Sequence, residues 1–229
     1  MPGVTRRIRY DRRPMTAIVL AGGKSSRMGR DKAGLAIGPR TLIEHVLAQL
    51  EPRFDEVVVS VSKGQSLPPG ALRPDCRPQA PIGERVAGAA RLVRADRVRV
   101  VEDDLIGLGP LVGIRAGLRA AANQSCAVFA CDIPEIDFTQ LRLLVRAAVR
   151  QGAEIAVPRG PSGRFEPLFA VYRKSVVPAI DALLAEETRT VISLFDRCRT
   201  TVVQLQDDRW LRNINTPSDY RSYLNSLFD

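Results

Sequence analysis

Short apolar runs alternate with amphipathic stretches along most of the 229 residues of this chain. Runs rich in β-branched residues indicate strands, and apolar residues spaced three or four positions apart indicate helices. On this basis we expect strands at residues 16–21, 56–62, 97–102, 126–131, 153–157 and 168–172, and helices at residues 41–50, 113–122, 138–151, 176–186 and 216–226. Because strands and helices alternate, we expect an α/β fold with a mostly parallel sheet and helices on both faces.

The first predicted strand ends in a loop of glycines, hydroxyls and cations. Residues 19–32 read V-L-A-G-G-K-S-S-R-M-G-R-D-K. The glycines let the backbone approach an anion closely, Ser25 and Ser26 can donate hydrogen bonds, and Arg27 and Lys32 supply positive charge. One charge-assisted contact of this kind contributes about 1.5–3 kcal/mol. We therefore interpret the segment as a phosphate-binding loop; the alternative is a glycine-rich turn with solvated charges.

Two commoner phosphate-binding motifs do not fit this loop. A Walker loop ending in Gly23-Lys24-Ser25 requires a glycine five places before Gly23, and Ile18 stands there. A dinucleotide fingerprint requires Gly-x-Gly-x-x-Gly, whereas the glycines here are adjacent and the next one is Gly29. The loop therefore indicates a different class of phosphate-binding protein.

Carboxylates follow two other predicted strands. Asp103 comes directly after the strand at 97–102, and Asp132 after the strand at 126–131. Ligands of open α/β sheets bind beyond the carboxyl ends of the strands, so we expect both residues and the glycine loop to share one edge. Mg²⁺ usually takes one or two protein carboxylates, which makes Asp132 the candidate metal ligand. The alternative for Asp132 is a strand-end cap. The alternative for Asp103 is a solvated acidic turn, and its neighbour Asp104 could take the place of Asp103 in the site.

The glycine loop and the later motifs together resemble the MobA-type molybdenum cofactor guanylyltransferase family of nucleotidyltransferases. The matching residues are L-A-G-G at 20–23, R-M-G at 27–29, D-K at 31–32, V-E-D at 101–103, G-P-L-V-G at 109–113, C-D-I-P at 131–134 and N-I-N-T-P at 213–217. The resemblance covers about residues 15–227, and ordered motifs of this number rarely arise together by chance.

The resemblance implies a three-layer Rossmann-like nucleotidyltransferase domain over residues 15–229. It also implies a reaction in which the terminal phosphate of molybdopterin, or of Mo-molybdopterin, attacks the α-phosphorus of GTP and releases pyrophosphate, with Mg²⁺ as cofactor. A phosphate oxygen is already deprotonated near pH 7, so such a site needs no general base. Its substrates would be GTP and molybdopterin, and a transient contact with other molybdenum cofactor biosynthesis proteins is expected.

The resemblance also assigns roles to individual residues. Lys32 and Arg27 would bind the phosphates, with Lys32 stabilising the departing pyrophosphate, and Asp132 would hold the metal. Asn213 and Asn215 would lie on the acceptor side, although the same segment could be only a helix N-cap. The residues expected to bind the nucleotide are Leu20, Ala21, Gly22, Gly23, Lys32, Ser60, Asp103 and Asp132.

The choice of base depends on a few positions. The cytidylyltransferase branch tends to show Leu-Ala-Ala-Gly and Pro-Leu-Arg-Gly, whereas this chain has Gly22 and Val112 at the differing places. Guanine is therefore favoured, although Ser60 stands where several guanylyltransferases carry an asparagine. The alternatives are a molybdopterin cytidylyltransferase, a sugar-phosphate nucleotidyltransferase and a nucleotide-binding regulatory module without turnover.

The charge of the chain is +9 and is unevenly spread. Residues 1–13 hold five arginines against one aspartate, so we expect residues 1–14 to be a disordered basic tail. Aromatic residues make up only 5% of the chain, which leaves few stacking platforms for nucleic acid. The apolar run at 17–21 is too short for a signal peptide, and no run approaches the ~20 residues of a membrane span. We expect a cytoplasmic protein that binds neither nucleic acid nor membranes.

Histidine and cysteine offer little chemistry. His45 is the only histidine and lies among apolar residues of the helix expected at 41–50, so we interpret it as a packed helix residue. Cys126 and Cys131 are five apart on one expected strand and should point to opposite faces, which excludes a shared metal. These two residues, with Cys76 and Cys198, are expected to be core residues in a reducing compartment. Residues 64–96 are rich in proline and are expected to be irregular.

Overall fold

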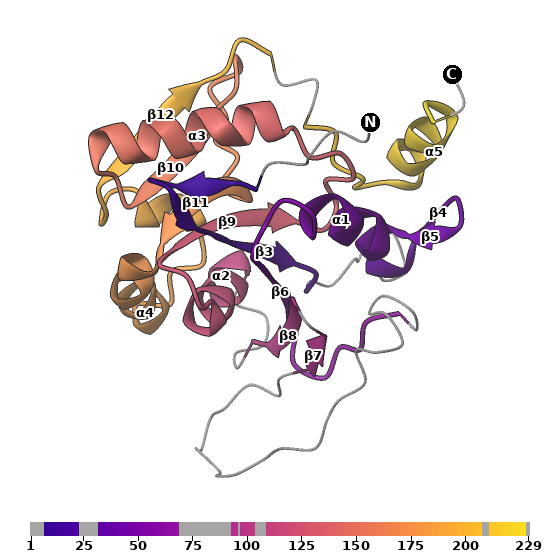
Figure 1. Cartoon of the computed structure of the whole chain (residues 1–229), viewed down its shortest axis with the longest axis horizontal. Coiled ribbons are helices and arrows are strands. Elements are labelled where there is room, and N and C mark those ends of the chain that lie inside the picture. The colour runs from indigo at the N-terminus through magenta and orange to yellow at the C-terminus, as the bar shows by residue number, and fades with distance from the viewer. Residues whose placement is uncertain are drawn as a thin grey trace.

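An eight-stranded sheet forms the centre of the molecule (Figure 1). The computed structural model describes residues 7–22, 32–68, 93–95, 97–103, 109–207 and 211–227. In spatial order the strands are β12 (Thr200–Gln204), β10 (Ile155–Arg159), β11 (Phe169–Arg173), β9 (Ser125–Ala130), β3 (Thr16–Leu20), β6 (Glu56–Val61), β8 (Val98–Glu102) and β7 (Val93–Ala95). All run in the same direction except β7 and β11, which are antiparallel to their neighbours. The expected mostly parallel sheet is therefore confirmed.

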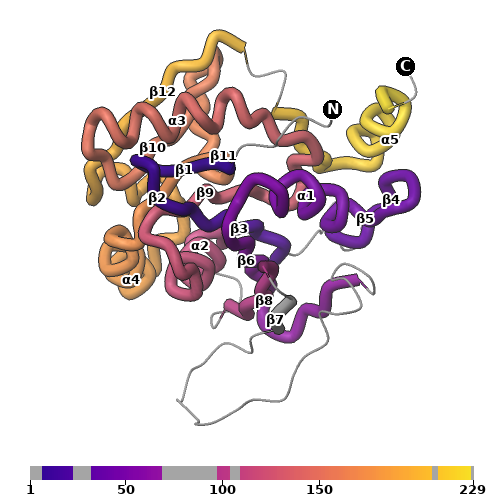
Figure 2. Tube along the Cα trace, viewed as in Figure 1, coloured from indigo at the N-terminus to yellow at the C-terminus, as the bar shows by residue number. Residues whose placement is uncertain are grey.

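Helices cover both faces of this sheet, as the alternating pattern predicts. One face carries α1 (Leu42–Leu50) and α3 (Phe138–Gln151), and the other carries α2 (Pro110–Ala120) and α4 (Val177–Ala185). A fifth helix, α5 (Pro217–Asn225), lies beside α1 and the short β4 (Ala36–Ile37) and β5 (Arg40–Thr41) (Figure 2). The arrangement has three layers: helices, sheet, helices.

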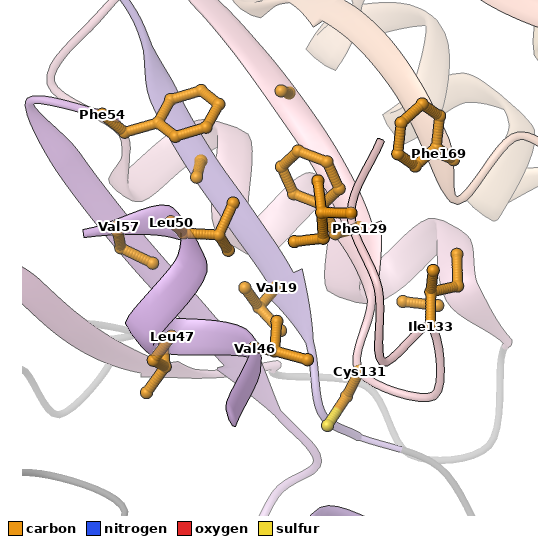
Figure 3. Close-up of a cluster of buried hydrophobic side chains, with 14 of the residues drawn as sticks. Val19, Val46, Leu47, Leu50, Phe54, Val57, Phe129, Cys131, Ile133 and Phe169 are labelled. Atoms are coloured by element: carbon orange, nitrogen blue, oxygen red, sulfur yellow. The ribbon is translucent and has the colours of Figure 1, made fainter. Parts of the chain in front are cut away.

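Strand β3 shows why the core has two halves. All its residues are buried, and successive side chains point to opposite faces. Val19 packs against α1 and contributes to a cluster in which the ring of Phe129 lies edge-to-face between Phe54 and Phe169, with centroids 6.0 and 5.6 Å away (Figure 3). Ile18 faces α2 on the other side. Fully burying one such side chain stabilises the fold by about 1.5–3 kcal/mol.

The predicted elements all occur, with boundaries shifted by a few residues. The largest shift is at α2, which begins at Pro110, because Gly109 takes φ 77° and the proline then occupies the first helical turn. Among the strands of the described residues, β12, the β4–β5 hairpin and β7 were not predicted, and β7 lies inside the stretch expected to be irregular. Strand β12 reads T-T-V-V-Q and is only partly buried, so its alternation is weak.

The expectation of a disordered tail is wrong for residues 7–14. These residues form a hairpin of β1 (Arg9–Tyr10) and β2 (Arg13–Pro14), and the side chain of Ile8 is 3% exposed. Arg7 and Arg9 each donate to the carboxylate of Asp55 at 2.7 Å. This order was not predicted because residues 7–14 have no apolar periodicity. One buried isoleucine and two ion pairs to a distant residue leave no pattern in the local sequence that would predict order.

The cysteines of β9 and of the turn after it agree with the prediction. Cys126 packs on the α2 face and Cys131 on the α1 face, so they point to opposite sides. Burial raises the pKa of the Cys126 thiol to about 12, which makes it chemically inert. Cys76 lies outside the described residues. Within the described ranges, none of the helices combines the length and the apolar character needed to cross a lipid bilayer.

Candidate active site

Four neighbouring parallel strands end at the same edge of the sheet. In the order β9, β3, β6, β8 they are followed by Asp132, Gly22, Ser62 and Asp103. The two aspartates and the first residues of the glycine loop thus lie at one edge, as expected; residues 23–31 of the loop lie outside the described residues. Neighbouring strands lie about 4.8 Å apart, and β8 is three strands from β9, so the strands that carry Asp103 and Asp132 are about 14 Å apart. The two carboxylates therefore serve separate parts of the site.

The first residues of the glycine loop are tightly held. The N–H of Ala21 donates to the carbonyl of Ser60 at 2.8 Å, and the side-chain amide of Gln65 donates to the carbonyl of Ala21 at 3.0 Å. A Cβ on Gly22 would lie 2.7 Å from the hydroxyl of Ser62 and 2.8 Å from its backbone nitrogen. Only glycine fits there, because no flexible side-chain end could move to make room.

Lys32, Asp132 and Asn215 form a cluster, which we call the Lys32 cluster. The ammonium of Lys32, which opens the 3-10 helix η1 (Lys32–Gly34), donates to Oδ2 of Asp132 and to Oδ1 of Asn215, each at 2.8 Å. The side chains of Lys32 and Asp132 are 20% and 22% exposed, so solvent and an incoming anion can reach both. Residues that the sequence assigns to three different motifs thus come together. Gly23 and Arg27 lie outside the described residues, and their roles stay predictions.

The backbone holds Asp132 independently of its carboxylate. The N–H of Ile214 donates to the carbonyl of Asp132 at 2.8 Å, and the N–H of the preceding Cys131 donates to the carbonyl of Leu20 at 3.0 Å. The carboxylate itself contacts the Lys32 ammonium. Asp132 therefore connects β3 and the segment before α5, rather than acting only as the cap of its own strand.

The segment that contains the two asparagines caps α5 and also reaches the Lys32 cluster, while its place on the acceptor side stays a prediction. Thr216 is the N-cap of α5, and Asp219 accepts hydrogen bonds from the N–H groups of Asn215 at 3.0 Å and Thr216 at 2.8 Å. This capping box leaves the side chain of Asn215 free to contact Lys32. Among the described residues, the buried Oδ1 of Asn213 has no hydrogen-bond partner, so this acceptor is left unsatisfied by that part of the chain.

The structure buries Ser60 beneath α2 and Asp103 beside the end of β6. Ser60 is 2% exposed, and a Cβ on Gly113 of α2 would lie 3.3 Å from its hydroxyl, which has no partner in the described part of the chain. Asp103 is 9% exposed, and its N–H donates to the carbonyl of Val61 at 2.9 Å. In this structure α2 covers Ser60, and the contact of Ser60 with a nucleotide stays a prediction.

Two side chains near the glycine loop were missed by the sequence analysis. Ser62 lies two positions after Ser60 and so projects to the same side of β6, a signal that was available in the sequence. Gln65 gives no such signal, because a single glutamine in a loop has no pattern. Its amide oxygen accepts from the N–H of Ser62 at 3.3 Å while its nitrogen holds Ala21, so it connects the ends of β3 and β6.

The acidic residues fit a metal that is held mainly by its substrate. Within the described ranges, no group of three or more histidine, cysteine, aspartate or glutamate side chains could hold a metal ion. Mg²⁺ bound together with nucleotide phosphates needs only one or two protein carboxylates and keeps several waters. The partly exposed carboxylate of Asp132, beside a lysine that can share a phosphate, is a suitable donor for such an ion.

Comparison with known proteins gives consistent matches. Residues 17–202 match the sequence model of the family described as the MobA-like NTP transferase domain. A probable molybdenum cofactor guanylyltransferase of Mycobacterium marinum is 35% identical over 210 residues, which is 90% of each chain. One of the same description from Carboxydothermus hydrogenoformans is 28% identical over 221 residues, 92% of this chain and 95% of the relative.

The fold also matches a solved structure. The crystal structure of molybdopterin-guanine dinucleotide biosynthesis protein A from Archaeoglobus fulgidus superimposes with a TM-score of 0.71 at 23% identity, and covers 93% of this chain and 99% of the other. At that identity the likeness shows the fold, and the expected Rossmann-like nucleotidyltransferase architecture is confirmed.

Proposed function

Because the chain belongs to the MobA-like NTP transferase family, we propose that it transfers GMP from GTP to molybdopterin or Mo-molybdopterin, forming the guanine dinucleotide cofactor and pyrophosphate. The family identifies the chain as a nucleotidyltransferase enzyme. Two observations support the finer assignment of base and acceptor. Relatives named as molybdenum cofactor guanylyltransferases match over about nine-tenths of the chain, and Gly22 and Val112 differ from the cytidylyltransferase pattern.

The Lys32 cluster is the observation that carries this proposal. Asp132 and Asn215 lie 100 and 183 residues after Lys32 in the sequence, yet the lysine ammonium is 2.8 Å from an oxygen of each. A cation that already faces a carboxylate at the carboxyl edge of the sheet is suited to bind phosphate oxygens there. Each charge-assisted hydrogen bond to a phosphate contributes about 1.5–3 kcal/mol.

The reaction needs positioning and charge neutralisation rather than proton transfer. A phosphate oxygen of the acceptor forms a bond to the α-phosphorus of GTP, while the bond from this phosphorus to the β-phosphate bridging oxygen breaks and pyrophosphate departs. Lys32 donates to the phosphates and stabilises the negative charge that grows on the leaving group. One well-placed electrostatic donor lowers such a barrier by about 3–4 kcal/mol.

MobA-type nucleotidyltransferases typically use a divalent metal ion, and we assign Mg²⁺ to this chain, held by Asp132. When bound, the ion neutralises phosphate charge and orients the triphosphate. Asp103, whose strand is about 14 Å from that of Asp132, then contacts the nucleoside part rather than the metal. Asn213 and Asn215, in the segment that leads into α5, then lie on the acceptor side.

Pyrophosphate release measured with each of the four NTPs, with and without molybdopterin, tests the proposal. We expect release only with GTP, molybdopterin and Mg²⁺ together. Faster release with CTP would assign the chain to the cytidylyltransferases instead. If GTP raised the melting temperature but no combination released pyrophosphate, the chain would be a nucleotide-binding module. A ligand at ~100 times its dissociation constant raises the free energy of unfolding by about 2.7 kcal/mol, so binding would be visible in the melting temperature.

A further inference from the structure

The C-terminal helix α5 contacts each of the three segments that carry the Lys32 cluster. The helix has nine residues, whereas isolated helices shorter than about 12–15 residues are marginal in water. Only Tyr223 of this helix is buried. The position of α5 therefore depends on a small number of side-chain contacts, and three of them lead back to the cluster.

The first contact fixes Asn215. Asp219, in the first turn of α5, accepts hydrogen bonds from the N–H groups of Asn215 and Thr216, and its own N–H donates to the hydroxyl of Thr216 at 3.1 Å. The backbone N–H of Asn215 thus attaches this residue to the start of the helix. Any movement of α5 therefore moves the side chain of Asn215 relative to Lys32.

The second contact reaches the segment that carries Lys32. The hydroxyl of Tyr220 donates to the carbonyl of Ala36 at 2.5 Å. Ala36 opens β4, which is separated only by Leu35 from the 3-10 helix that Lys32 begins. Tyr220 therefore ties α5 to the segment from which the lysine ammonium projects.

The third contact reaches the loop after Asp132. The hydroxyl of Tyr223 donates to Oε1 of Glu135 at 2.5 Å, and Nε2 of His45 on α1 lies 3.2 Å from both oxygens. The histidine expected to be a packed helix residue thus takes part in a polar group that is only partly buried, since the side chain of His45 is 23% exposed and that of Glu135 is 59% exposed. Gln49, one turn further along α1, holds the same loop, because it donates to the carbonyl of Pro134 at 2.7 Å and accepts from the N–H of residue 136 at 3.1 Å.

We propose that Tyr220 and Tyr223 are positioning residues that hold Lys32 and Asp132 in register with Asn215 on the acceptor side of the site. This inference rests on the proposed function. A displacement of about 1 Å at a reacting centre can lower the rate ~10²-fold, so side chains that never touch a substrate can control turnover. The tyrosines act through Ala36 and Glu135, and neither hydroxyl contacts a residue of the Lys32 cluster directly.

Turnover of Tyr223→Phe and Tyr220→Phe tests this role, because each variant loses one hydroxyl and keeps the ring. We expect kcat/KM for molybdopterin to fall at least fivefold in each variant, while KM for GTP stays within twofold of the wild type. Ser222→Ala is the matched control on the same helix; Ser222 is exposed, and its hydroxyl makes no hydrogen bond among the described residues. Unchanged kcat/KM in both tyrosine variants would overturn the proposal.

Amide hydrogen exchange of the enzyme without substrates provides a readout that does not require the reaction. The N–H of Ile214 donates to the carbonyl of Asp132, so it reports directly on the connection between the two segments. We expect this amide to exchange at least fivefold faster in Tyr223→Phe, with the amides of β3 and β9 unchanged. Exchange at Ile214 equal to the wild type, or acceleration throughout β3 and β9, would contradict a positioning role.

Variants of Glu135 separate this inference from a loss of folding and from a failure of the proposed function. Glu135→Gln keeps an acceptor for the Tyr223 hydroxyl and should retain more activity than Glu135→Ala. The double variant Tyr223→Phe with Glu135→Ala should have the same kcat/KM as Glu135→Ala, because the two changes remove the same hydrogen bond. Additive losses of kcat/KM would contradict this. A wild type without turnover would refute the proposed function, and exchange at Ile214 would still decide the role of Tyr223.

Discussion

Asp132 makes two separable contributions to the Lys32 cluster, since its carbonyl holds Ile214 and its carboxylate faces Lys32. Asp132→Asn keeps the shape and the backbone hydrogen bond but removes the charge. We expect turnover to fall at least ~10²-fold with little change in the free energy of unfolding. Steady-state turnover and urea unfolding measure the two effects, with Asp196→Asn, an exposed aspartate on the α4 side of the molecule, as control. Near-normal turnover of Asp132→Asn would show that the metal is held elsewhere.

Gly22 is the residue where backbone packing alone predicts a functional effect. In Gly22→Ala the new Cβ would lie 2.8 Å from the backbone nitrogen of Ser62, so the start of the glycine loop must shift. We expect the melting-temperature shift produced by GTP to be lost or strongly reduced. Gly34→Ala is the control, because its Cβ would meet only Pro68 at 3.4 Å, an ordinary contact. A full GTP shift in Gly22→Ala would show that the loop tolerates this displacement.

At the scale of elements, the β1–β2 hairpin and the site lie at opposite ends of the sheet. The hairpin contacts residues 53–55, just before β6 begins, whereas the site lies where β6 ends. Deleting residues 1–13 removes the burial of Ile8 and two partly exposed ion pairs, each contributing about 0.2–1 kcal/mol. We expect a lower free energy of unfolding by chemical denaturation and an unchanged rate at saturating substrate. A more than tenfold loss of rate in folded protein would mean that the hairpin contributes to the site.

At the scale of the whole molecule, carboxylates with lowered pKa values contribute to the loss of stability at acid pH. The hydrogen bond with His45 lowers the pKa of Glu135, the hydroxyl of Ser175 does the same for Glu154, and the N–H of Asn215 does so for Asp219. A carboxyl whose pKa is lower in the folded state stabilises the fold above its unfolded pKa, about 3.9–4.3. That contribution is lost as the pH falls through the folded pKa.

We therefore expect the free energy of unfolding to decrease steadily below about pH 4.5; near neutral pH the three groups contribute fully, so that their contribution changes little with pH there. Urea unfolding between pH 3 and pH 7 measures this dependence. Glu135→Gln should be less stable than the wild type at pH 7, and the difference should shrink toward pH 3. A difference that stayed constant with pH would show that the ionisation of Glu135 does not stabilise the fold.

Much of the fold follows from the sequence because its signals are local. The strands of the sheet centre are buried on both faces and read as apolar runs, as β3 does. Helix ends carry their own caps: Asp137 begins α3, and Gly152 ends it in the left-handed conformation. For such elements the chain within about ten residues contains the physical information, and prediction succeeds.

The sequence also determined which chemical groups gather at the carboxyl edge of the sheet. Glycines, a lysine, aspartates and asparagines after strands mark the carboxyl edge, since parallel strands bring their ends together. Only the tertiary structure decided how these groups meet: Lys32 contacts Asp132 and Asn215 across 100 and 183 residues, and Ile8 is buried against a segment more than forty residues away. Neither contact leaves a periodic pattern. The roles of Tyr220 and Tyr223 likewise depend on where a short helix docks, and docking is set by the shapes of surfaces that exist only after folding.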